Sequence, residues 1–224
     1  MSLLEKYEAM NSTDSKVALK EEVKGILRDY GNFLGYIAET LQNSVDSINR
    51  RFRLLNDPSY YLYQKFKEEN PTYEDNNYQG KIFIEIDTRT NKIKICDNWT
   101  GIKKENLDEI LLPKFSGKKM NQDYGFKGYG LTFVAFVSRE FNIKSKYFIT
   151  NKPYKYEING VFDWVTDDEK EFPNFPKEPI QINNFEMDEW STIIQIRLDD
   201  NYETRFDAVA ALDLSKDILM IKKI

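Results

Sequence analysis

The chain of 224 residues contains no histidine and a single cysteine, Cys96. The lack of histidine excludes a Ser-His-Asp triad, a Cys-His pair, histidine-bound zinc and a phosphohistidine within this chain. One cysteine allows neither an internal disulfide nor a thiolate metal site, and Cys96 lies in an apolar segment where we expect a buried, inert thiol. What remains is the chemistry of carboxylates, lysines, hydroxyls and backbone groups, which suits magnesium and phosphate.

Long apolar runs and a signal-peptide pattern are also missing, which predicts a cytoplasmic protein that does not span a membrane. The net charge of −5 argues against nucleic-acid binding over the whole surface, but leaves a local basic patch open. Apolar residues make up 41% of the chain, a globular composition that fits one large domain or two small ones.

The segment 33–55 contains no proline and predicts a long helix around which the rest is organised. Glu39, Asn43 and Asp46 share one narrow stripe of this helix. Asparagine and aspartate are poor helix formers, so their place in mid-helix beside a glutamate indicates chemistry, the alternative being a solvated polar face. Nearly opposite, apolar residues at helical spacing predict a single buried face: Leu34, Leu41, Val45, Ile48 and Phe52.

Other elements follow from periodicity and turn residues. Further helices are predicted at 17–30, 60–68, 103–112, 131–137 and 203–219, and strands at 81–87, 92–96, 142–149, 154–165, 180–184 and 192–198. The first two strands predict a hairpin, residues 1–15 an arm, and residues 56–80 an insertion or long loop. The ending of the chain predicts that it is the N-terminal part of a longer protein.

Two loops carry possible ligand chemistry. The second strand runs into Asp97-Asn98-Trp99-Thr100-Gly101, which fits either a plain strand-end cap or a binding loop. Gly125, Gly128 and Gly130 lie at the start of a predicted helix, where exposed backbone N–H groups form a phosphate cradle. A flexible turn is the alternative for these glycines, and their order does not follow a dinucleotide-binding fold.

In this order the motifs resemble the ATP site of the GHKL ATPase superfamily, which comprises gyrase B, the ninety-kilodalton heat-shock chaperone, histidine-kinase catalytic domains, MutL and MORC proteins. The resemblance covers roughly residues 33–198, and 101–104 and 125–128 look most like MutL and MORC relatives. It implies an α+β fold, a two-layer α/β sandwich of the Bergerat type with a mixed, mostly antiparallel sheet and helices on one face. Residues 1–224 would be one ATPase domain, with residues 1–30 as an N-terminal arm and helix and residues 101–130 as the ATP lid.

The resemblance also implies a role for each polar residue. Asn43 would coordinate Mg²⁺, and Glu39 would orient and deprotonate the attacking water. Asp46 would support the site near the base. Asp97 would accept a hydrogen bond from the adenine amino group, and Thr192 would bond to Asp97 or to the water beside adenine.

The glycines and lysines would serve the rest of the nucleotide. Gly101 would let the backbone approach the base, and Lys127 would help the three glycines of the cradle, Gly125, Gly128 and Gly130, to wrap the phosphates. Lys114, with Lys118 and Lys119, would neutralise phosphate charge when the lid closes. Trp99 stands where the family usually has glycine, which predicts a changed shape at the entrance of the adenine pocket. The γ-phosphate lysine that relatives often receive from a following domain is missing from the sequence, so slow turnover is expected.

The resemblance implies Mg²⁺-dependent ATP hydrolysis that drives lid closure and homodimerisation. It also suggests DNA transactions or defence, through other domains, as the setting. A non-hydrolysing ATP-binding switch or scaffold is one alternative, kept open by Trp99. A histidine-kinase catalytic domain is another, although such domains usually have a basic residue near Asp46 and no base at Glu39.

Overall fold

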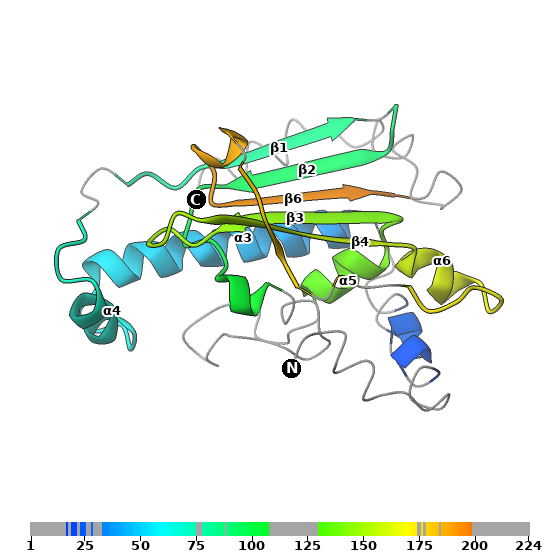
Figure 1. Ribbon diagram of the computed structural model, residues 1–224, viewed down its shortest axis with the longest axis horizontal. Helices are drawn as coiled ribbons and strands as arrows, with labels where there is room; N and C mark the ends of the chain where they lie inside the picture. The colour runs from blue at the N-terminus through cyan, green and yellow to red at the C-terminus, as the bar shows by residue number, and fades with distance from the viewer. Residues whose placement is uncertain are drawn as a thin grey trace.

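A six-stranded antiparallel sheet with helices packed on one face forms the fold of this chain (Figure 1). The computed structural model describes residues 17, 19–21, 23–25, 28, 33–74, 78–87, 89–107, 130–173, 176, 178–183 and 185–198. The predicted lid residues 108–129 and the predicted helix 203–219 lie outside this part of the chain.

The elements are short apart from one helix. The helices are α3 (Phe33–Asn56), α4 (Tyr63–Glu69), α5 (Gly130–Phe136) and α6 (Val161–Thr166), with single turns η1 (Lys104–Asn106) and η3 (Phe185–Met187). The strands are β1 (Ile82–Asp87), β2 (Lys92–Asp97), β3 (Glu140–Lys146), β4 (Pro153–Asn159), β5 (Ile180–Gln181) and β6 (Thr192–Arg197).

The order of strands in the sheet is β1-β2-β6-β3-β4-β5, and each neighbouring pair is antiparallel. The late strand β6 therefore lies between the hairpins β1–β2 and β3–β4. Its first residue, Thr192, is paired with Asp97 at the end of β2 and with Ser145 near the end of β3. This register gathers three polar side chains at one end of the central strands.

The main core lies between the sheet and the helices. Alternate residues of the central strands, among them Ile95, Ile143 and Ile194, form one buried cluster with Phe133 of α5 and Trp164 of α6. On the other face of the sheet, Cys96 packs with Met187 and Ile193. Burial raises the pKa of the Cys96 thiol to about 11, so the buried, inert thiol predicted from the sequence is confirmed.

The predicted fold class is confirmed, and the helix 33–56, the β1–β2 hairpin and β6 form where the sequence predicts them. The sheet is antiparallel in all its described pairs, where some parallel pairing was expected. The predicted strand 154–165 is wrong beyond Asn159. Gly160 turns the chain with a φ of +79°, and the buried run after it forms α6. A continuous apolar run fits a buried helix as well as a strand.

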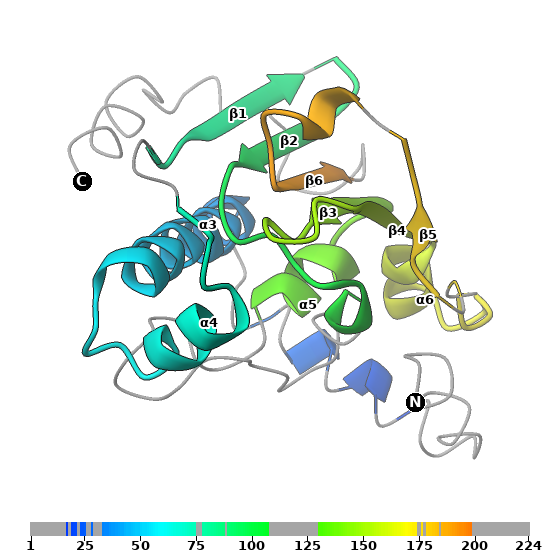
Figure 2. The same cartoon turned by 60° about the vertical axis from the view of Figure 1, so that its left-hand side comes forward.

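The segment 56–80 is a packed unit rather than an open loop in its described part. Leu54 of α3 clusters with Tyr60 and with Phe66 of α4, and the Phe66 ring stacks on Phe148 with centroids 5.7 Å apart. Figure 2 shows α4 beside the C-terminal end of α3. The predicted helix 103–112 is described only as far as residue 107. In this part it forms the single turn η1.

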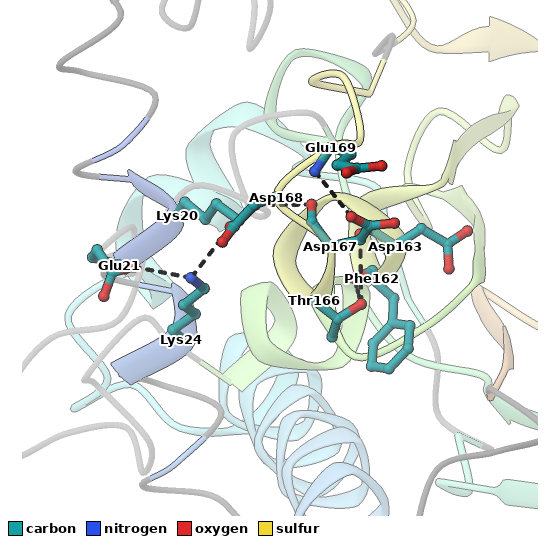
Figure 3. Close-up of polar contacts among 9 residues, drawn as sticks. All are labelled: Lys20, Glu21, Lys24, Phe162, Asp163, Thr166, Asp167, Asp168 and Glu169. Carbon is teal, nitrogen blue, oxygen red and sulfur yellow. Dashed lines mark hydrogen bonds and ion pairs between the residues drawn. The ribbon is translucent and has the colours of Figure 1, made fainter.

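The described residues of the N-terminal segment are helical and attached to the loop after α6 (Figure 3). The Lys20 ammonium donates to the backbone carbonyl of Asp167 at 3.0 Å and pairs with Asp168 at 2.8 Å. Lys24 pairs with Glu21 at 3.1 Å and lies 3.7 Å from the same Asp168 carboxylate. Leu19 and Val23 of this segment join the main core, so apolar packing and ion pairs hold it in place together.

Candidate functional site

The most buried side of α3 carries hydroxyl groups. Thr40 and Ser44 are only 1% and 3% exposed, and Ser47 is half-buried one turn further along. This side lies between the two stripes that the sequence predicts. A buried hydroxyl needs a hydrogen-bond partner, and the hydroxyls of Ser44 and Ser47 have theirs in Asp97 and Thr100.

The predicted apolar stripe is not the buried face of α3. Leu41, Val45 and Ile48 are half-buried, and Phe52 is 57% exposed. Leu41 packs against the main core, so the predicted apolar face is confirmed there, but the prediction is wrong at Phe52. The most buried side of the helix is its hydroxyl side, which faces the end of β2 and the loop that follows.

The acidic and amide stripe of α3 is withdrawn from water rather than solvated. Glu39 and Asn43 are half-buried, and Asp46 is 6% exposed. The Gln42 side-chain amide donates to Asp46 Oδ1 at 2.9 Å. Both carboxylates and the amide therefore sit on one rigid helix in a partly dry environment, where charged and polar groups act more strongly than in water.

Asp97 is the best candidate for a ligand-binding group. Its side chain is 5% exposed, and Ser44 donates to Oδ2 at 3.4 Å. The other oxygen, Oδ1, is fully buried and has no hydrogen-bond partner among the residues that the structure describes. A buried carboxylate oxygen left unpaired is costly, and a ligand donor is one way to satisfy it.

Burial raises the pKa of Asp97 to about 8, because removal from water disfavours the carboxylate. The Trp99 backbone N–H and the hydroxyls of Ser44 and Thr192 oppose this shift by stabilising the charge. Near neutral pH the side chain is therefore poised between acid and carboxylate. A strongly shifted pKa is typical of functional groups.

A network of hydroxyls fixes the strand ends around Asp97. The Ser145 hydroxyl donates to the Ser191 carbonyl at 2.9 Å and accepts from the Ile102 N–H at 2.8 Å. It also lies 3.2 Å from the Thr192 hydroxyl. Thr192 thus stands beside Asp97 and is itself held by Ser145, as a supporting residue would be.

Gly101 is required by the fold of the loop after β2. Its φ is +64°, and a Cβ atom there would lie 1.8 Å from the Lys146 carbonyl oxygen. The sequence assigned Gly101 to close approach of the base. The structure gives it a different close neighbour, the backbone at the end of β3.

Residues 98–100 are bound to α3 by side chains that sequence reasoning did not single out. One guanidinium nitrogen of Arg51 donates to the carbonyls of Asn98 and Trp99, both at 2.9 Å. The hydroxyls of Ser47 and Thr100 are 2.9 Å apart. Ser44, Ser47 and Arg51 recur at spacings of three and four residues, a helical period that would have revealed this face.

The structure places some predicted site residues and not others. Glu39, Asn43 and Asp46 share α3, and Ser44 of the same helix reaches Asp97, which is paired with Thr192. Gly130 is the first residue of α5. Gly125, Gly128, Lys127 and Lys114 lie outside the described residues. Trp99 is fully buried and belongs to the packed interior rather than to the exposed surface.

The described residues contain no group of three or more histidine, cysteine, aspartate or glutamate side chains placed to hold a metal ion. No helix in the same part of the chain has both the length and the apolar character needed to cross a membrane.

Fold and site together define an α+β protein with a polar helix face set against a buried strand-end carboxylate. No protein-family model matches the chain, and a search of curated proteins found no match. Among solved structures, the chain is similar to the ATPase and transducer domains of DNA topoisomerase II from Balamuthia mandrillaris, with 18% identity and a TM-score of 0.44. The similarity covers 73% of this chain and 36% of that one.

Proposed function

We propose that this chain is an ATPase of the GHKL type, which binds ATP between α3 and the loop after β2 and hydrolyses it with Mg²⁺. The single observation that carries the proposal is Asp97, whose Oδ1 is buried without a hydrogen-bond partner among the described residues. Such an oxygen fits the amino group of adenine, which is a donor that guanine lacks at that position. The order of motifs along the chain supports the same assignment.

The side chains present fit a magnesium nucleotide. Mg²⁺ prefers oxygen ligands and usually keeps several waters beside substrate phosphates, so one protein ligand such as the Asn43 amide oxygen is sufficient. When bound, the metal would neutralise charge that develops on the phosphate oxygens.

Each residue would have its own part in the reaction. Asp97 would accept the adenine amino hydrogen bond as a carboxylate, and Thr192 would hold that carboxylate in place. Glu39, one helical turn before Asn43, would orient the attacking water and take its proton. The glycines 125, 128 and 130 with Lys127 and Lys114 would surround the phosphates when the lid 101–130 closes, and closure would allow two copies to dimerise. Other domains could connect this cycle to DNA.

Calorimetry with ATP and ADP, with and without Mg²⁺, tests the proposal. Wild type should bind, Asp97→Asn should not, and Asn43→Ala should lose the effect of Mg²⁺ on affinity. Asp87→Asn, the same change at an exposed strand end, serves as the control and should bind normally. Absence of nucleotide binding by a folded wild type at millimolar concentration would reject the proposed function.

A non-hydrolysing ATP switch is the second candidate. The buried Trp99, in the position where related proteins usually have glycine, favours it, because a rigid, filled loop can retain binding while turnover is lost. Single-turnover hydrolysis separates the two. An ATPase should release phosphate in wild type and not in Glu39→Gln, whereas a switch should release none in either protein.

A further inference from the structure

A second cleft lies beside the loop that follows β2, outside the proposed ATP site. Its volume is about 420 Å³, within the range of small-molecule sites. Its walls include Arg51 of α3, Lys146 at the end of β3 and Asn98 of the loop. None of the described ATP-site candidates Glu39, Asn43, Asp46, Asp97 and Thr192 lines it, so this inference does not rest on the proposed function.

Lys146 lines this cleft without a carboxylate partner for its charge among the described residues. Its ammonium reaches the Asp188 backbone carbonyl only at 3.4 Å, and within the described residues no carboxylate lies within 4.0 Å of it. Burial lowers the pKa of Lys146, Asp188 opposes that shift, and the nearby Arg51 charge adds to it. An anion between the two cations would relieve both the burial and the repulsion.

Arg51 gives the cleft a fixed positive wall. Its guanidinium carbon lies 4.2 Å from the centre of the Tyr78 ring and 4.8 Å from that of Phe148. Hydrogen bonds to the carbonyls of Asn98 and Trp99 hold the same group in one orientation. A cation positioned in this way loses little side-chain entropy when an anion binds near it.

The rest of the lining is polar and of mixed charge. Lys81 pairs with Glu189 at 3.3 Å across the rim, and the side chains of Asn98, Asp188 and Ser191 add donors and acceptors. Carboxylates on the rim disfavour a polyanion such as nucleic acid, in a chain that is already acidic. They suit a small ligand that bears hydroxyl groups next to one anionic group.

We propose that this cleft binds a phosphate-bearing small molecule, with the phosphate between Lys146 and Arg51 and ligand hydroxyls toward Asp188 and Glu189. Inorganic phosphate and a sugar phosphate share the anionic group. The carboxylates of the rim favour the sugar phosphate. The site would also touch Asn98, which directly follows Asp97 in the chain.

Lysine footprinting on the whole chain tests this directly. The protein is treated with limiting acetylating reagent, and modification of Lys146 is quantified by mass spectrometry beside that of Lys170, an exposed lysine after α6. Lys146 should be protected by millimolar glucose 6-phosphate, less by inorganic phosphate and not by glucose, while Lys170 stays unchanged. Because these probes contain no base, the result is independent of ATP binding at Asp97.

Titration of variants supplies the second measurement. Lys146→Gln should weaken glucose 6-phosphate binding by about tenfold or more, because a charge-assisted contact is lost. Lys146→Arg should retain most of the binding, and Lys170→Gln should equal wild type. Protection that is equal at both lysines, or binding unchanged in a folded Lys146→Gln protein, would overturn the proposal.

Discussion

Ser44 on α3 donates its hydroxyl hydrogen bond to Asp97 Oδ2 at 3.4 Å, across 53 residues of sequence. This contact joins the helix that carries Glu39 and Asn43 to the end of the central strand β2. It satisfies one carboxylate oxygen and leaves Oδ1 without a partner among the described residues. The first predictions follow from this imbalance.

Replacement of Asp97 by asparagine should separate stability from binding. The folded chain holds a proton on Asp97 up to a pH of about 8, whereas the unfolded carboxyl loses it near 3.8. The stabilisation from the folded-state proton is fully present below the unfolded pKa of 3.8. It is lost as pH rises through the folded pKa of about 8. At pH 9, Asp97→Asn should therefore be more stable than wild type, by roughly 1–3 kcal/mol, since it carries no buried charge.

Urea denaturation at pH 5 and pH 9 measures this difference, and ADP titration of the same variant should show no binding. Asp87→Asn should instead be less stable than wild type and should bind ADP normally. The Thr90 hydroxyl and the Arg89 N–H lower the pKa of Asp87, so its ionised form is favoured by folding. A wild type that gains stability between pH 6 and pH 9 relative to Asp97→Asn would contradict the assignment.

Nucleotide affinity should rise with pH. An adenine amino group donates to the carboxylate form of Asp97, so binding below the pKa of about 8 must release a proton. Affinity for ADP should increase by about tenfold per pH unit from pH 6 to 8 and level off above. Calorimetry in two buffers of different ionisation enthalpy counts the released proton. Affinity that falls above pH 8 would instead mean that the ligand accepts a hydrogen bond from the neutral acid.

Hydrolysis of ATP should require Glu39, whereas nucleotide affinity should not. Glu39→Gln keeps the size of the side chain on α3 but cannot take a proton from water. We expect nucleotide affinity within about threefold of wild type and a loss of turnover of about a hundredfold or more. Phosphate release under single-turnover conditions gives the rate. Equal rates in both proteins would remove Glu39 from the reaction and direct attention to another base.

Three glycines at different places in the fold offer a graded test of the close backbone contact at Gly101. Gly101→Ala combines a φ of +64° with a contact of 1.8 Å to the Lys146 carbonyl, so it should destabilise the fold by about 3 kcal/mol or more. Gly160→Ala has the strained φ of +79° but open space, and about 1 kcal/mol is expected. Gly25→Ala has neither problem and should be neutral or stabilising. Similar losses at Gly101 and Gly160 would contradict the close approach.

The sequence predicted the sheet well because its strands alternate clearly, as in Ile82, Ile84 and Ile86 of β1, which all turn to one side. It failed at α6 because the run from Val161 to Val165 has no period that separates helix from strand. Gly160 is recognisable as a turn residue, but nothing in the apolar run after it shows that the chain continues as a helix.

Sequence patterns singled out Glu39, Asn43 and Asp97, but not Ser44, Ser47 and Arg51, which attach α3 to Asp97 and to the loop after β2. Asn43 attracts notice because asparagine is a poor helix former placed in mid-helix in line with Glu39, and Asp97 because it ends a strand just before a turn. Ser44 and Ser47 are ordinary helix-surface residues until the rotation of α3 is known. That rotation depends on contacts with Asp97 and Thr100, which lie 53 residues away and are set by tertiary packing.

The position of β6 between two hairpins has a consequence for how the chain matures. Both β1–β2 and β3–β4 consist of neighbours in sequence, but each meets the other only through a strand that follows them in the chain. During synthesis from the N-terminus, the sheet therefore stays in two halves until residues 192–197 emerge. Asp97 acquires its strand partner Thr192 in the same step, so completion of the sheet and completion of the site coincide.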